Sequence, residues 1–164
     1  MSRRLLIQNA SLVLSDRVVE GDLRVADTQI VKVAPGGGLS PEESESILDA
    51  TGLHLLPGAI DPQVHFREPG QPDREDIGSG SRAAAAGGVT AFLDMPNNVP
   101  AATTLASIQS KIDSAGRNGV NHHGFFIGAT PDNVSDLQDA VGTPEAPSPT
   151  DGICGIKVFM GSST

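Results

Sequence analysis

Polar side chains able to do chemistry gather in one short stretch of this chain, around His65. Gln63 and His65 stand two positions apart in a strand-like stretch, residues 59–66, and Arg67 continues the same spacing. Side chains alternate between the two faces of a β-strand, so this spacing places all three on one face. A strand buried on both faces would carry valine or isoleucine there. The pattern therefore indicates a functional site where this strand ends.

The residue types at these positions suit ligand binding. A neutral imidazole such as that of His65 is a common zinc ligand, and the guanidinium of Arg67 matches a carboxylate with two parallel hydrogen bonds. Asn97 and Lys157 add polar groups in or just after two later strand-like stretches. Because barrel enzymes place their sites at the carboxyl ends of their strands, these residues are expected to converge there.

The same residues also have structural readings. A lone histidine is more often a structural residue than a ligand. Arg67 has Glu68 and Asp61 within reach as ion-pair partners, and Asn97 directly follows a proline, which is typical of a turn. Lys157 lies between two apolar neighbours and points to the opposite face from them, so it is either solvated at a strand end or directed into the interior of the fold.

Three stretches in order resemble the cyclic amidohydrolases, and dihydroorotase in particular. Residues 57–70, which read PGAIDPQVHFREPG, are similar to the first barrel strand of that family. Residues 94–98 (DMPNN) and 155–161 (GIKVFMG) agree with it. One departure is clear, because the family usually reads His-x-His and this chain has Gln63 in place of the first histidine.

The resemblance implies a role for each site residue. His65 would bind Zn²⁺, as one or two ions, and Lys157 would carry a CO₂-derived carbamate that bridges two metals. Arg67 and Asn97 would hold the carboxylate of the substrate. Gln63 is a doubtful metal ligand, because a neutral amide oxygen binds zinc less well than imidazole. Its presence leaves three readings open: a weaker first metal, a single metal, or a degenerate site.

By the same resemblance, the whole protein would interconvert dihydroorotate and N-carbamoyl-aspartate in pyrimidine biosynthesis. The catalytic proton shuttle and the remaining histidine ligands would lie beyond Thr164. One alternative is another cyclic amidohydrolase, allantoinase-like or hydantoinase-like, and a second is a non-catalytic dihydroorotase-like structural subunit. The partner would be a small-molecule substrate, with a homo-oligomer or an association with aspartate carbamoyltransferase both left open.

Residues 1–56 have the pattern of a small β-sandwich segment. Short apolar runs alternate with Gly, Asn and Asp, and their spacing favours strands over βα units. The runs cover residues 5–7, 12–14, 23–25, 30–33 and 53–56.

From residue 57 the pattern changes to alternating strands and helices, which predicts an α/β fold with a parallel sheet. Expected strands cover residues 59–66, 89–95, 122–128 and 153–160, with helices at 79–86, after Thr103 or Thr104, and after Asp132 or Asn133. A complete (β/α)8 barrel needs about 250 residues. Residues 57–164 therefore fit the first half of such a barrel in a chain that looks truncated, and the fragment alone is expected to be inactive.

Composition narrows the functional classes. Eleven Lys and Arg against 20 Asp and Glu give a net charge of −9, which argues against nucleic-acid binding. The single cysteine, Cys154, excludes an internal disulfide and fits a reducing compartment. The sequence has neither a long apolar run nor a signal-peptide core. A cytoplasmic protein without membrane contact is expected.

Overall fold

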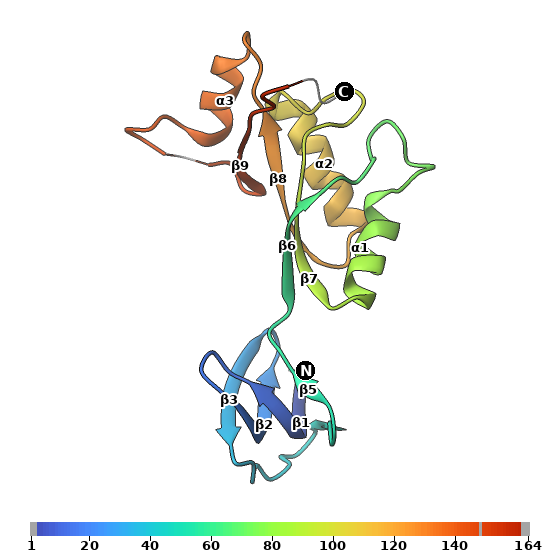
Figure 1. Ribbon diagram of the computed structural model, residues 1–164, viewed down its shortest axis with the longest axis vertical. Helices are drawn as coiled ribbons and strands as arrows, with labels where there is room; N and C mark the ends of the chain where they lie inside the picture. The colour runs from blue at the N-terminus through green and yellow to red at the C-terminus, as the bar shows by residue number, and fades with distance from the viewer. Residues whose placement is uncertain (1–2, 148, 162–164) are drawn as a thin grey trace. The chain divides into compact units, whose positions relative to one another are not determined.

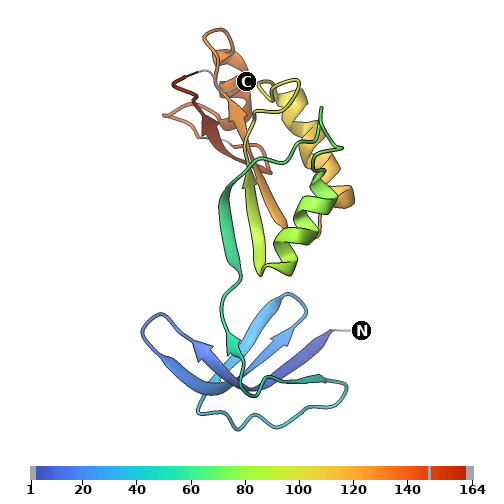
Figure 2. The same ribbon diagram turned by 45° about the vertical axis from the view of Figure 1, so that its right-hand side comes forward.

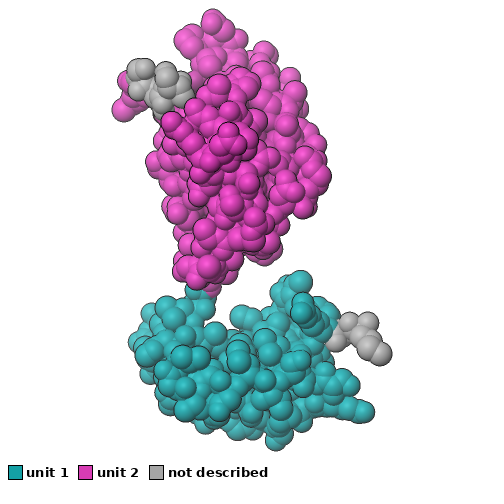
Figure 3. Space-filling model, turned by 90° about the vertical axis from the view of Figure 1, so that its right-hand side faces the viewer, with its two compact units in different colours: residues 1–57 teal, residues 58–164 magenta. Residues whose placement is uncertain are grey.

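A computed structural model describes residues 3–147 and 149–161 of the chain (Figure 1). The chain divides into two compact units, residues 1–57 and residues 58–164 (Figure 3). The first unit is all β, and the second alternates strands with helices. Within the described ranges, no helix is long and apolar enough to span a membrane.

The first unit is a single mixed β-sheet built around its first strand. β2 pairs with β1 in antiparallel fashion and β3 continues beyond β2, whereas β4 and β5 both pair with β1 in parallel fashion. The strands are β1 (Arg4–Val13), β2 (Val18–Ala26), β3 (Gln29–Pro35), β4 (Ser46–Asp49) and β5 (His54–Leu55).

β1 joins two stretches that the sequence pattern separates, residues 5–7 and 12–14. The backbone at Asn9 has a φ of 60°, and the register with β2 shifts around this residue. Asp22 of β2 accepts a hydrogen bond from the Asn9 N–H at 3.0 Å. The side chain of a neighbouring strand therefore holds the irregularity in place, and the strand continues through it.

The described residues of this unit make one sheet, and its role as a segment of a β-sandwich stays a prediction. Its small apolar cluster consists of Ile7, Ala10, Leu12 and Ala50 with partly buried neighbours. The pattern of apolar residues predicts that strands bury one face, but it does not say what covers that face. The pattern therefore predicts the strands of this unit but not what covers their sheet.

The second unit is a four-stranded parallel sheet in the order β6-β7-β8-β9, with a helix between successive strands. All three neighbouring pairs are parallel, which confirms the predicted α/β repeat. The elements are β6 (Ala59–Val64), α1 (Ile77–Ala86), β7 (Val89–Asp94), α2 (Leu105–Asn118), β8 (His122–Gly128), α3 (Val134–Val141) and β9 (Ile153–Lys157).

Side-chain caps define where the first two helices begin. Asp76 precedes α1 and accepts a hydrogen bond from the Ser79 N–H, and Thr104 precedes α2 and accepts one from the Ser107 N–H. These bonds satisfy backbone donors that a helix start leaves free. Asn133 precedes α3 without capping it, because its side-chain oxygen accepts from the Thr130 N–H instead.

The core of the second unit lies between the sheet and the helices. Figure 2 shows α1 and α2 next to each other on one side of the sheet. The ring centroids of Phe66 and Phe92 are 4.8 Å apart in an edge-to-face arrangement. Gly80 of α1 lies so close to Phe66 that a Cβ there would be 2.4 Å from the ring. The large side chains that are fully buried in this core are Ile77, Phe92, Ile108, Phe125 and Ile127.

Candidate functional site

His65 and Asn97, both predicted site residues, meet where β6 and β7 end. His65 follows β6 directly, and Asn97 lies three residues beyond β7. Nδ1 of His65 is 2.8 Å from Oδ1 of Asn97. An amide oxygen only accepts hydrogen bonds, so this pairing places the proton on Nδ1. The lone pair on Nε2 of His65 is therefore left for a ligand, as in metal-binding histidines.

The face of the sheet toward which the His65 side chain points follows from its neighbours in the strand. Val64 packs against the hydrophobic core between sheet and helices. Strand alternation then turns Gln63 and His65 to the opposite face, as the spacing predicts. Gln63 is exposed, and its backbone N–H donates to Oδ1 of Asp61 at 3.0 Å. Its side-chain amide makes no hydrogen bond within the described ranges.

Arg67 lies in a loop and not in the row of strand residues that the sequence suggests, because β6 ends at Val64. Its backbone N–H donates to the Glu75 carbonyl at 3.0 Å, and its own carbonyl accepts from the Gln71 N–H at 2.8 Å. The two backbone bonds fix the main chain of this loop at Arg67.

The acidic residues that could have paired with Arg67 are occupied by other partners. Glu68 accepts the Ile77 N–H at 3.0 Å and the Ser114 hydroxyl, and Asp61 accepts the Gln63 N–H. Over residues 3–147 and 149–161, no acid forms an ion pair with Arg67. The structural reading of Arg67 as an internal ion-pair partner is therefore wrong.

Lys157 is the last residue of β9, and its side chain lies on the face of the sheet away from the core. In the register of β8 with β9, Ile156 is opposite the buried Ile127, so Lys157 takes the other face. Its Nζ lies 5.4 Å from the ring centroid of Phe159. Phe159 and Asn97 line one hollow of about 160 Å³ at the strand ends.

His65 and Lys157 lie on the same face of the sheet, but their side chains do not contact each other. β6 and β9 form the two edges of the sheet, so three strand spacings separate them. In a flat sheet that distance would be about 14 Å. No hydrogen bond joins the two side chains among the described residues. A common ligand between them therefore requires the sheet to curve, as in a closed barrel.

The donors present fit part of a zinc site. Within the described ranges no three His, Cys, Asp or Glu residues lie close enough together to hold a metal. Zinc sites use three or more protein ligands. Nε2 of His65 carries a free lone pair and suits one zinc ligand. The Gln63 amide oxygen would be a weaker second ligand, and Lys157 would become a ligand only after its amine is modified.

A fully buried ion pair beside the site was missed by the sequence reasoning, which assigned Asp94 no role. Nζ of Lys111 lies 2.8 Å from Oδ2 of Asp94, and neither side chain is exposed. Burial raises the pKa of Asp94 and lowers that of Lys111, while their mutual attraction opposes both shifts. The sequence did contain one sign of this ion pair, because Lys111 stands three residues after Ile108 and four before Ala115, on the apolar face of α2.

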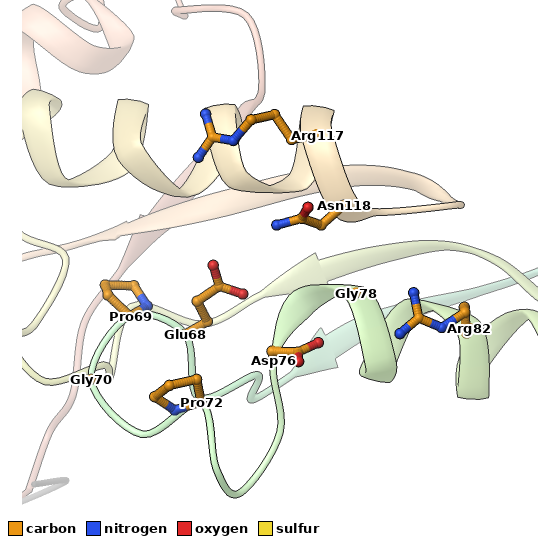
Figure 4. A pocket seen from close by; sticks show the side chains of 9 residues that line it. All are labelled: Glu68, Pro69, Gly70, Pro72, Asp76, Gly78, Arg82, Arg117 and Asn118. Carbon is orange, nitrogen blue, oxygen red and sulfur yellow. The ribbon is translucent and has the colours of Figure 1, made fainter.

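A larger hollow of the second unit lies on the helix side of the sheet. It measures about 790 Å³ and is bordered by α1 and α2, with Asp76 and Arg82 on one side and Arg117 and Asn118 on the other (Figure 4). Parallel α/β proteins place their chemistry at the carboxyl ends of strands. The smaller hollow next to Asn97 is therefore the better candidate.

Comparison with solved structures defines the class. The L-hydantoinase from Arthrobacter aurescens superposes with a TM-score of 0.83 and 27% identity, over 100% of this chain and 34% of that chain. A D-hydantoinase gives a TM-score of 0.75 at 26% identity, over 98% of this chain and 33% of that one. The fold matches the N-terminal part of hydantoinase-like amidohydrolase barrels.

Sequence comparison then gives the family. The sequence model of the family described as Dihydro-orotase-like matches residues 52–146, and the chain belongs to that family. An allantoinase of Desulfitobacterium hafniense (strain DSM 10664 / DCB-2) is 33% identical over 94% of this chain and 32% of its own length. A dihydroorotase of Streptococcus pneumoniae serotype 4 is 42% identical over 61% of this chain and 23% of its own length. The chain thus spans about a third or less of these relatives.

Proposed function

We propose that the whole protein hydrolyses a cyclic amide that carries a carboxylate, interconverting dihydroorotate and N-carbamoyl-aspartate. The observation that carries the proposal is the guanidinium of Arg67, which has no acidic partner among the described residues and follows His65 by two positions. A guanidinium without an internal partner suits a ligand carboxylate. Hydantoin and allantoin carry no carboxylate, so the same group has less to bind in them.

Asn97 serves two partners in this proposal. Its Oδ1 is used by Nδ1 of His65, which leaves its amide N–H groups as donors. One of them would bind the substrate carboxylate together with Arg67. Two donors on one carboxylate fix the ring relative to His65, and such orientation lowers the entropic part of the barrier.

His65 would bind zinc through Nε2, with Lys157 contributing after its unprotonated amine attacks CO₂, forming an N–C bond and releasing a proton. A zinc ion held there would polarise the ring carbonyl and lower the pKa of a bound water. Gln63 would weaken the site relative to a histidine at that position. Further ligands and a carboxylate that moves the proton would come from the part of the relatives' length that this chain does not span.

The test is a substrate panel on the full-length protein with Zn²⁺ and bicarbonate. We expect ring opening of dihydroorotate, and Arg67→Gln should lower its kcat/KM about 10²- to 10³-fold, because the charged contact to the substrate carboxylate is lost. Arg82→Gln, an exposed arginine on α1, is the matched control and should leave turnover unchanged. Equal activity of Arg67→Gln and the wild type would contradict the proposal.

An allantoinase is the second candidate. Its support is the 33% identity to curated allantoinases over almost the whole of this chain. The same panel decides between them: preferred turnover of allantoin, unaffected by Arg67→Gln, would establish the second candidate. Absence of turnover on every substrate, with Zn²⁺ bound or not, would favour a non-catalytic subunit that assembles with another enzyme.

A further inference from the structure

The ammonium of Lys111 joins three groups that border the candidate site. It lies 2.8 Å from Oδ2 of Asp94, donates to the Met95 carbonyl at 3.0 Å, and donates to Oδ1 of Asn98 at 2.7 Å. Three oxygen atoms therefore lie within 3.0 Å of the ammonium, and all of them belong to one stretch, residues 94–98. That stretch also carries Asn97.

Two of those partners extend the network to the other side of the site. Oδ1 of Asp94 accepts the Phe66 N–H at 3.0 Å, and the Asn98 amide donates to the carbonyls of Phe66 and Glu68 at 3.1 and 3.0 Å. Phe66 follows His65 directly. The main chain after His65 is thus bound through both its N–H and its carbonyls to the residues that flank Asn97.

A merely structural role does not require these charges. Lys111 lies on the apolar face of α2, between Ile108 and Ala115, where a leucine or methionine would pack. Removing two charges from water is costly, and replacing a buried ion pair with apolar side chains is often neutral or stabilising. What an apolar pair cannot do is fix the relative position of two loops through directional hydrogen bonds.

We propose that Lys111 and Asp94 are positioning residues, which hold the loops after β6 and β7 so that Nδ1 of His65 meets Oδ1 of Asn97. The network thereby determines which nitrogen of His65 is free to act as a ligand. This inference gives Asp94 and Lys111 a role in the site of the proposed function and rests on that function for its catalytic consequence. The part of the inference that concerns which ring nitrogen of His65 carries the proton does not depend on the proposed function.

The experiment compares three variants of the full-length, metal-free protein with the wild type. Lys111→Met leaves Asp94 as a lone buried charge, whereas Asp94→Asn combined with Lys111→Met removes both charges and keeps the acceptor for the Phe66 N–H. Asn98→Ala leaves the ion pair and removes the bonds to the carbonyls after His65. Leu137→Ala, in α3 against the same core, is the control for lost stability without a change in the network.

The main readout is the tautomer of His65, read from the ¹⁵N shifts of its ring nitrogens. We expect the Nδ1–H form in the wild type and in Leu137→Ala, and a mixture of tautomers in the double variant and in Asn98→Ala. With a turned-over substrate, kcat of those two should fall about 10- to 100-fold at a temperature at which they are fully folded. Leu137→Ala should keep its kcat.

Every outcome of this experiment either supports or contradicts the positioning role of Lys111 and Asp94. If Lys111→Met fails to fold, the double variant carries the test, because it buries no lone charge, and Asn98→Ala repeats it with the ion pair intact. A double variant and an Asn98→Ala protein that both keep the Nδ1–H tautomer would overturn the positioning role. If no cyclic amide is turned over, the proposed function fails, yet the tautomer of His65 still answers the question about Lys111.

Discussion

At the scale of single residues, the amide oxygen of Asn97 determines the chemistry available to His65. Only one nitrogen of a neutral imidazole carries a proton, and a hydrogen bond from that nitrogen directs the other toward a ligand. The 2.8 Å contact with Nδ1 makes Nε2 the ligand atom. Substituting Asn97 therefore changes which ring nitrogen of His65 carries the proton, although His65 itself is kept.

We expect Asn97→Ala to lower the zinc affinity of the full-length protein about 10- to 100-fold, as loss of a partner behind a metal-bound histidine typically does. Zinc affinity is measured by competition with a chromophoric chelator. Asn118→Ala, at the exposed end of α2, is the control and should bind zinc like the wild type. Unchanged affinity in Asn97→Ala would mean that His65 needs no such partner.

Strand alternation was sufficient to predict the face of the sheet on which His65 lies, and the family resemblance pointed to Asn97, whereas the contact between the two came only from the structure. Lys111 was not predicted, since a lysine is normally solvent-exposed and its partner Asp94 is distant in sequence. A charged residue inside an apolar helix face was the only local sign of the pair. Sequence spacing also continued the row of strand residues to Arg67, whereas the strand ends at Val64 and Arg67 lies in the loop that follows.

At the scale of elements, α2 positions Lys111, and its start is set by Thr104. The Thr104 hydroxyl accepts the Ser107 N–H at 3.2 Å, and the Ser107 hydroxyl in turn accepts the Thr104 N–H at 3.1 Å. We expect Thr104→Ala to lower the free energy of unfolding by about 1 kcal/mol. Urea denaturation measures this change, and Thr104→Asn, which keeps an acceptor, should stay close to the wild type. Equal loss in both variants would exclude the cap as the cause.

Asp76 caps the start of α1, and this cap is sensitive to pH. The Ser79 N–H, followed by the Ser79 hydroxyl, lowers the pKa of Asp76 below its ordinary value of 3.8. A carboxylate with a lowered pKa in the folded state adds stability above 3.8, and this stability is lost as the pH falls through the lowered pKa. In Asp76→Asn, which caps without a charge, the stability should fall less steeply with acid. Parallel pH profiles from urea denaturation would contradict this.

Helix and strand positions followed from sequence more closely than their ends. β8 was predicted with its observed bounds, because a glycine and a polar pair delimit an apolar stretch. β6 and β9 end earlier than expected, at Val64 and Lys157, and the loop that follows β6 is held by side chains such as Asn98. Those side chains act across the fold, and no local pattern reveals them.

At the scale of the whole molecule, the number of metal ligands limits what residues 1–164 do alone. We expect this chain by itself to show no measurable ring opening of dihydroorotate with added Zn²⁺ and bicarbonate. His65 and a modified Lys157 are fewer than the three protein ligands that zinc sites need, and they lie on opposite edges of the sheet. Clear turnover by the purified chain, abolished by Lys157→Ala, would show that the site is assigned incorrectly.

The alternation of strands and helices was predicted for the second unit because each strand and helix has its own periodicity. For the first unit the pattern predicts the strands but not what covers their sheet, because the face that a β-strand buries does not identify the element packed on it. The two units also have separate hydrophobic clusters, one around Leu12 and one around Phe92. The sequence therefore predicts which strands and helices each unit contains more reliably than it predicts how they pack.

The ion pair between Asp94 and Lys111 also constrains how the sequence can evolve. Replacing either residue alone leaves a charge in the core without its partner, at a cost of about 3–5 kcal/mol, which is a large part of a typical domain's stability. A lineage that loses one member is therefore expected to lose the other soon afterwards or to restore the first. Relatives should accordingly carry both charges or neither, and those with neither should hold the loop after the first barrel strand by other means.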